Sequence, residues 1–335
     1  MQYRVAVLVF VGMIAASPAG ATRLAGEFMA LGAGARALGM GGAFGAVADD
    51  ASAVYWNPAG IAGIEKRQAL AMHAEQFGDL VNYNFGAYIQ PTTLVSPERK
   101  PAFGFALIHL GVPDIPVTSH LPFVDLNGNG EFDSGTETLL DLDKVYYESD
   151  NSFAGFATFA LETGAGNVAG TLKLIYQDAI AGESSMGIGI DLGYLRRDFL
   201  TPRLSIGAKL QDATGTYISW STGTNEFIVP MLKVGGAYRI VSEAFNGALL
   251  LAADADIFFD DRRTASQFWV ETFSSDLHLG AELSFQDHVM IRGGLDGENA
   301  TAGAGVYFAM VGLDYAYLHH DAFEATHRVS ILANF

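Results

Sequence analysis

The 335-residue sequence contains no cysteine. Disulfides, thiolate zinc sites and cysteine nucleophiles are therefore excluded. Charged residues are also scarce, at 17% of the chain, where an ordinary globular protein has about a quarter. The 19 Lys and Arg against 37 Asp and Glu give a formal net charge of -18, without a basic cluster, which excludes nucleic acid as a partner. Half of the residues are apolar, which excludes a disordered acidic chain.

Long apolar runs are missing beyond the first 21 residues, so the sequence predicts no transmembrane helix, which needs about 20 apolar residues. Residues 1–21 have the pattern of a secretory signal peptide: Arg4, an apolar run from Val5 to Ala16, and an A-x-A-type cleavage site at Ala19–Ala21. The alternative, an N-terminal membrane anchor, would need a longer run. A lipoprotein anchor would need a cysteine. We therefore expect an exported protein.

Alternation of apolar and polar residues is the pattern that recurs along the chain. In residues 277–285 the odd positions are apolar and the even positions are polar or Gly, which is typical of a strand with two unlike faces. A soluble sandwich would also alternate. About fourteen segments of roughly ten residues, joined by short turns and long loops, instead favour an outer-membrane barrel. We place these segments at 67–76, 81–89, 101–110, 152–161, 168–178, 184–195, 202–211, 229–240, 247–257, 276–286, 288–294, 300–307, 309–318 and 325–335.

The predicted fold is thus an all-β membrane protein: an antiparallel barrel of about 14 strands over residues 67–335, with a long extracellular loop at 111–151. Its last strand is amphipathic and ends on Phe335. A terminal aromatic on such a strand resembles the signal that bacterial barrel-insertion machinery recognises. The alternative is a strand that simply ends the chain.

Residues 22–66 precede the barrel and are predicted to form a small plug, or hatch, inside it. Glycines at 32, 34, 39, 41, 42 and 45 allow tight turns and close packing. Asp49 or Asp50 can cap a short helix over 51–56, which the sequence Asn57-Pro58-Ala59-Gly60 would end. A nucleotide-binding loop is the rival interpretation, but no strand precedes the glycines and no Gly-Lys-Ser/Thr follows them. Asn57 to Gly60 form either a structural turn or part of a gate.

A second motif lies within the long loop. Residues 125–137 match the start of a calcium-binding loop, with Gly at the sixth position. The candidate ligands are Asp125, Asn127, Asn129, Glu131 (through its carbonyl), Asp133 and Glu137. Thr136 stands where the bidentate Glu is expected, so we expect weak binding of Ca²⁺. The alternative is an acidic, solvated turn.

Polar residues on the inward phase of the late strands are the candidate lumen residues: His278, Glu282, Arg292, Asp314 and Arg328. Opposite charges on neighbouring strands predict a paired network that holds the hatch. No motif places a nucleophile beside a base and a third, orienting group. The sequence therefore predicts a protein that is not an enzyme.

The N-terminal block from Leu31 to Gly60 resembles that of PorV/PorQ-family outer-membrane proteins, which are similar to FadL-type transporters. The PorV/PorQ resemblance implies a barrel in the outer membrane of a Gram-negative-type bacterium, in contact with its lipid, that handles exported cargo proteins in type IX-like secretion or surface attachment. The FadL likeness implies the alternative, a diffusion channel for hydrophobic small molecules such as long-chain fatty acids. A structural barrel without cargo is a third option. An apolar lumen cavity with a kinked wall strand would favour the channel, and an empty barrel with an acidic outer surface would favour protein handling.

Overall fold

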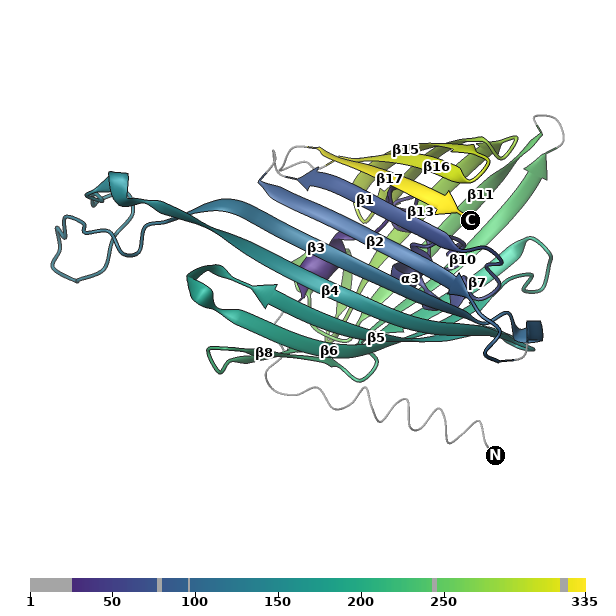
Figure 1. Cartoon of the computed structure of the whole chain (residues 1–335), viewed down its shortest axis with the longest axis horizontal. Helices are drawn as coiled ribbons and strands as arrows, with labels where there is room; N and C mark the ends of the chain where they lie inside the picture. The colour runs from purple at the N-terminus through teal and green to yellow at the C-terminus, as the bar shows by residue number, and fades with distance from the viewer. Residues whose placement is uncertain (1–25, 77–79, 96, 243–245, 320–324) are drawn as a thin grey trace.

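The computed structural model describes residues 26–76, 80–95, 97–242, 246–319 and 325–335. The predicted signal peptide, residues 1–21, lies outside these residues. Fourteen of the strands in the described residues form one closed antiparallel barrel, in which β1 pairs with β17 (Figure 1). The predicted fold class is therefore confirmed. No helix among the described residues is long and apolar enough to cross a membrane.

The barrel strands follow one another around the wall in chain order. They are β1 (Gln68–Gln76), β2 (Val81–Pro91), β3 (Ala102–Val117), β4 (Tyr146–Thr163), β5 (Gly166–Asp178), β6 (Ser184–Arg196), β7 (Leu204–Gln211), β10 (Met231–Ser242), β11 (Gly247–Phe258), β13 (Phe273–Phe285), β14 (Val289–Asp296), β15 (Asn299–Phe308), β16 (Val311–Leu318) and β17 (Thr326–Asn334). Three short strands, β8 (Thr216–Trp220), β9 (Asn225–Ile228) and β12 (Phe268–Val270), extend the wall at the ends of their neighbours.

Side-chain alternation gives the wall its two faces. In β6, Ile188, Ile190 and Leu192 are 54%, 40% and 48% exposed, whereas Asp191 between them is 1% exposed. Since neighbours along a strand point to opposite faces, the apolar phase forms the outer surface and the charged phase faces the interior. An apolar outer band with a polar interior is the arrangement of outer-membrane barrels.

The third and fourth strands are much longer than predicted. Strands β3 and β4 together project beyond the rest of the barrel as a two-stranded ribbon, and only residues 118–145 of the expected 111–151 loop lie between them (Figure 1). Pro113 and Pro116 argue against a strand, because proline cannot donate to the ladder. They are tolerated because the pairing of β3 with β2 ends at Gly111, which leaves the far part of β3 with a free edge.

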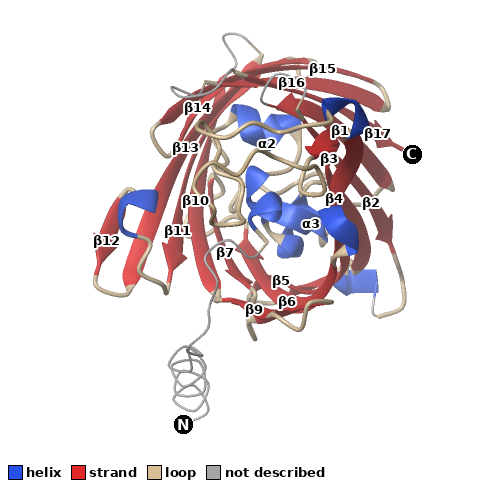
Figure 2. Ribbon diagram, turned by 90° about the vertical axis from the view of Figure 1, so that its left-hand side faces the viewer, coloured by secondary structure: helices blue, strands red, loops and turns tan. Residues whose placement is uncertain are grey.

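The N-terminal part of the described chain, residues 26–66, lies within the ring of strands (Figure 2). We call it the hatch. It contains four short helices: η1 (Glu27–Leu31), α2 (Ala35–Gly39), α3 (Ala53–Trp56) and η2 (Pro58–Ile61). The remaining short helices, η3 (Pro97–Arg99), η4 (Leu142–Lys144), η5 (Ile180–Gly182) and η6 (Arg263–Ala265), lie in the connections between strands.

The helix α3 differs from the one predicted over 51–56. It begins at Ala53, after Ser52, and no side chain caps it. Asp50 instead accepts hydrogen bonds from the backbone N–H and the hydroxyl of Ser52, at 2.8 and 2.6 Å, and lies two residues before the position that would cap the helix. The helix ends as expected, because Asn57 is extended before Pro58.

Glycines allow the hatch and the wall to touch backbone to backbone. Gly41 has a φ of 63°, and a Cβ there would lie 2.5 Å from the carbonyl oxygen of Leu295. A Cβ at Gly207 of β7 would lie 2.1 Å from the carbonyl oxygen of Gly45. Neither position accepts a side chain without displacing backbone, so hatch and wall form one packed body at these points.

Candidate functional site

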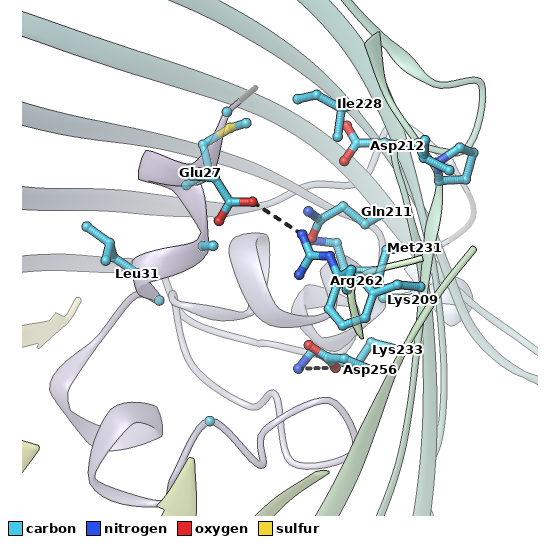
Figure 3. Close-up of a pocket in the computed structure, with 18 of the residues that line it drawn as sticks. Glu27, Leu31, Lys209, Gln211, Asp212, Ile228, Met231, Lys233, Asp256 and Arg262 are labelled. Carbon is cyan, nitrogen blue, oxygen red and sulfur yellow. Dashed lines mark hydrogen bonds and ion pairs between the residues drawn. The ribbon is translucent and has the colours of Figure 1, made fainter. Parts of the chain in front are cut away.

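A cavity of about 290 Å³ lies between the hatch and the wall (Figure 3). On the hatch side it is lined by η1 and by the aromatic pair at the end of α3, and on the wall side by residues of β7, β9, β10, β11 and β13. Its apolar lining includes Met29, Leu31, Tyr55, Trp56, Phe227, Ile228 and Phe258. Charged side chains share the lining, among them Glu27, Asp256 and His278. A preformed cavity that combines apolar and polar groups is typical of small-molecule sites.

The wall beside this cavity is interrupted. Strand β6 pairs first with β8 and then with β7, and residues 212–215 between β7 and β8 form a tight turn instead of continuing the ladder. Asp212 and Gly215 have φ values of 53° and 74°, and the Gly215 N–H donates to the carbonyl of Asp212 at 2.7 Å. Opposite this turn, residues 229–230 separate β9 from β10, and Pro230 has no N–H to donate. We call residues 212–215 and 229–230 the wall break.

Buried charges hold the wall break in place. The Asp212 carboxylate accepts hydrogen bonds from the Lys173 ammonium and the Thr216 hydroxyl. The Asp212 N–H donates to Asp191 at 2.9 Å, and Lys173 also lies 3.5 Å from Asp191. Lys173, Asp191 and Asp212 are each 1% exposed. Since a buried charge is costly without its partner, this cluster favours one conformation of the turn.

The cations that line the cavity are all bound to other protein groups. Arg262 pairs with Glu27 of η1 at 3.2 Å and lies 3.9 Å above the ring of Phe258. Lys233 pairs with Asp256 at 2.6 Å (Figure 3). Lys209 donates to the carbonyl of Tyr55 at 2.7 Å and lies 3.3 Å from Asp191. Their charges are therefore neutralised within the protein.

The predicted lumen residues fall into separate groups. Arg292 joins Glu282 and Asp314 at 2.6 Å each, and Arg36 of the hatch adds a two-pronged contact to Glu282 at 2.9 and 3.0 Å. His278 is not part of this network: its Nδ1 lies 3.0 Å from Asp296 and from the carbonyl of Gly41, and its Nε2 lies 3.5 Å from Asp256. Arg328 joins neither group.

Arg36 is a hatch anchor that the sequence reasoning missed. Burial disfavours its charge, but Asp49, Glu282 and Asp50 more than offset this effect and raise the pKa of Arg36 well above its usual value. Burial raises the pKa of Asp50 in turn, although Arg36 opposes the change. The sequence offered one signal: Arg36 is a lone charged residue within a run of small apolar residues predicted to lie inside the barrel. An unpaired cation is unfavourable there, so a carboxylate partner could have been expected.

A carboxylate on β11, the strand that pairs with β13, also anchors the hatch. Asp254 accepts hydrogen bonds from the N–H groups of Phe44 and Gly45 at 3.0 and 2.7 Å. The inward-facing position of Asp254 on β11 could be predicted from the sequence. Its two backbone partners could not, because they depend on how the Gly-rich segment of the hatch folds. On β17, the Ser330 hydroxyl accepts a hydrogen bond from the Ala35 N–H at 2.8 Å.

The predicted turn at Asn57 to Gly60 joins the hatch to the wall. Asn57 is fully buried, and its Nδ2 donates to the carbonyls of Gly45 and Tyr194 at 2.7 and 2.9 Å. Its Oδ1 accepts the Ala59 N–H at 3.2 Å, and a Cβ at Gly60 would lie 2.0 Å from the carbonyl oxygen of Ala48. Pro58 starts η2. These contacts support the structural interpretation of the turn, while its part in gating stays a prediction.

The predicted calcium ligands lie in the loop between β3 and β4, where they bond mainly to one another and to loop backbone. Asp125 accepts from the N–H groups of Gly128 and Gly130 at 2.6 and 3.0 Å. Glu137 accepts from Leu126 and Asp133 N–H at 2.8 and 3.0 Å. The side-chain amides of Asn127 and Asn129 both donate to Asp133, and the Glu131 N–H donates to Asn129 at 2.8 Å.

No set of three or more His, Asp or Glu side chains arranged to hold a metal is found among the described residues. Calcium binding at residues 125–137 therefore stays a prediction. Phe335 is exposed, with its ring 6.4 Å from that of Tyr88 and its backbone paired with Arg67. Recognition of Phe335 by insertion machinery also stays a prediction.

Comparison with known proteins returns structural matches alone. No family model and no curated protein matches the sequence. The CymD monoaromatic hydrocarbon channel matches with a TM-score of 0.54 at 13% identity, over 91% of this chain and 98% of its own. The TodX deltaS2S3 mutant monoaromatic hydrocarbon channel matches with a TM-score of 0.52 at 13% identity, over 91% and 99%. A Pseudomonas aeruginosa FadL homologue matches with a TM-score of 0.51 at 12% identity, over 90% and 97%. At these identities the likeness establishes a shared fold: this chain has the barrel fold of these three proteins.

Proposed function

We propose that this protein is an outer-membrane diffusion channel for compact hydrophobic molecules. The observation that carries the proposal is the cavity at the wall break, with its cluster of apolar and aromatic side chains. The cavity lies in the lumen and shares Gln211, Asp212, Val229 and Pro230 with the interrupted wall. A molecule held there has a way toward the lipid that does not require the whole barrel to open.

The cavity volume limits the size of the ligand. An engineered cavity of about 150 Å³ holds one benzene molecule, so a volume of about 290 Å³ suits a molecule of one or two rings or a short chain. Drug-sized ligands occupy cavities of about 300–1,000 Å³, so this one lies at the lower limit. Two of the structural neighbours are named as monoaromatic hydrocarbon channels, and none of the three reported is an enzyme, which also favours transport.

The anchors of the hatch favour a lateral route over an axial one. Asn57, Asp254 and Arg36 connect the hatch to β6, β11 and β13 through hydrogen bonds that are buried or partly buried. Moving the hatch as a body would break all of them and leave their partners unsatisfied, at about 1–3 kcal/mol each. A shift of the wall break leaves these hatch anchors in place and breaks instead the contacts of Asp212 with Lys173 and Thr216.

One observation keeps the PorV/PorQ-type role as a second candidate. Residues 112–150 carry nine Asp and Glu against a single Lys. The ribbon and its loop also expose apolar side chains, with Leu126, Leu142 and Tyr147 at 68%, 62% and 63%. An acidic, partly apolar projection suits contact with exported proteins, whereas the filled lumen argues against an empty protein-handling barrel.

Uptake by whole cells decides between the two roles. Cells that express the barrel should take up labelled toluene faster than cells with an empty vector, and Trp56→Ala should change the rate while the lipid-facing Leu172→Ala should not. Equal uptake with and without the barrel, together with a protein that co-purifies in stoichiometric amount, would favour the secretion role instead.

A further inference from the structure

Arg328 stands apart among the buried cations of the barrel. It is 3% exposed, on the inward phase of β17. Each of the other buried lysines and arginines in the described residues has a carboxylate within 4 Å: Lys173, Lys209, Lys233 and Arg292. In the same part of the chain, Arg328 has no such partner, and its Nε has no hydrogen-bond acceptor. This is unexpected in a protein with 37 acidic and 19 basic residues.

A second unsatisfied donor lies close to it. Tyr83 of β2 is fully buried, and its hydroxyl has no hydrogen-bond partner among the described residues. Ala74 of β1 pairs with Arg328 on one side and with Tyr83 on the other, so the three side chains point inward in one row. Two strand spacings separate Tyr83 from Arg328 by about 10 Å. Both side chains are long, and the small methyl of Ala74 leaves room for them to converge.

The row lies next to the cavity. Tyr55 lines the cavity, and its ring lies 6.5 Å from that of Phe85, the next inward-facing residue after Tyr83 on β2. The cations of the cavity lining are already bound to protein groups. An anion in this part of the lumen would therefore find its free counter-ion at Arg328.

We propose that Arg328 and Tyr83 form a binding point for an anionic oxygen group, of the carboxylate class, on a ligand held inside the barrel. This inference rests on the proposed channel function and adds that the ligand is amphipathic. A guanidinium binds a carboxylate through two parallel N–H···O hydrogen bonds, and the Tyr83 hydroxyl can donate a third. The ligand would remove the penalty of a buried, unpaired cation and would leave its apolar part to the cavity.

Paired probes of equal size test the charge preference. Benzoate, its neutral isostere benzamide and the apolar toluene are titrated separately into the purified full-length barrel in detergent by calorimetry. The variants are Arg328→Met, which removes the charge, Arg328→Lys, which keeps it, and Tyr83→Phe, which removes the hydroxyl alone. Arg239→Met, the same change at an exposed site on β10, is the matched control. Heat-dependent gel mobility checks that each barrel is folded.

We expect Arg328→Met to weaken benzoate binding at least about tenfold while benzamide binding changes less than about twofold. Arg328→Lys should restore part of the loss, and Tyr83→Phe should show a smaller one. Equal losses for benzoate and benzamide, or none for either, would overturn the proposal.

If acetate competes with benzoate at similar concentration, the site takes small carboxylates in general. Absence of binding by toluene, benzamide and benzoate alike would overturn the channel function as well, whereas toluene and benzamide binding without a benzoate effect would overturn this inference alone.

Discussion

The side chain of Asn57 donates a hydrogen bond to the carbonyl of Tyr194 at 2.9 Å, and this bond ties the turn of the hatch to strand β6. The same Nδ2 donates to Gly45 within the hatch at 2.7 Å. One buried amide therefore joins two hatch segments and the wall. The Asn57 side chain is closely packed against the wall, since a Cβ at Gly193 would lie 2.7 Å from the Asn57 Oδ1. No larger group fits there.

Replacing Asn57 should loosen this joint. Asn57→Ala leaves two buried carbonyls without donors, so we expect the free energy of unfolding to fall by about 1–3 kcal/mol. Conductance in planar bilayers should rise, because a less firmly held hatch blocks the lumen less well. Asn225→Ala, at an exposed residue of β9, is the control and should change neither quantity. Unchanged stability and conductance in Asn57→Ala would show that the joint is not needed.

Lys173 should be essential for the conformation of the wall break. Lys173→Met leaves Asp212 and Asp191 with one cation fewer, and breaking a buried pair costs about 3–5 kcal/mol. Adding Asp212→Asn removes the orphaned charge, so the double variant should be more stable than Lys173→Met alone. Denaturant unfolding of the unsubstituted protein, of the single variants Lys173→Met and Asp212→Asn, and of the double variant completes a double-mutant cycle. A coupling energy near zero would contradict a role for the pair.

The fold was largely predictable because alternation acts locally. In β6 the run from Met186 to Tyr194 specifies which side chains face lipid, and the burial of Asp191 agrees with that phase. The wall break was not predictable. Residues 212–215, Asp-Ala-Thr-Gly, have the composition of any loop, and the switch of β6 from β8 to β7 depends on pairing between distant segments.

The sequence predicted which charged residues of the late strands face the interior, but not which of them pair with one another. Inward charges on the late strands were expected to pair, and Arg292 does so with Glu282 and Asp314. Which residue stays unpaired depends on strand register and on the path of the hatch. The position of Arg328 beside two alanines, Ala74 and Ala316, follows from the pairing of β17 with β1 and β16 and is not visible in the sequence of β17 alone.

Calcium binding by the loop stays a prediction that one titration can test. We expect Ca²⁺ to bind at 125–137 with an affinity in the millimolar range, because Thr136 replaces the bidentate Glu of strong sites. Asp125→Asn and Asp133→Asn should each weaken binding, and Asp143→Asn, outside the motif, should not. Luminescence of Tb³⁺ bound to the purified barrel, displaced by Ca²⁺, reports the affinity. The same weak displacement in all variants would favour an acidic, solvated turn.

Filling the cavity should slow transport without disturbing the barrel. Ala30 of η1 is exposed and lines the cavity, so Ala30→Phe places a ring in the space that the proposed ligand needs. One benzene ring takes about half of the 290 Å³, and we expect toluene uptake to fall several-fold with little change in the free energy of unfolding. Ala165→Phe, at an exposed turn residue, is the matched control. Uptake that is slowed equally by both substitutions would point to a general effect on membrane insertion, and uptake unaffected by Ala30→Phe would place the route elsewhere in the lumen.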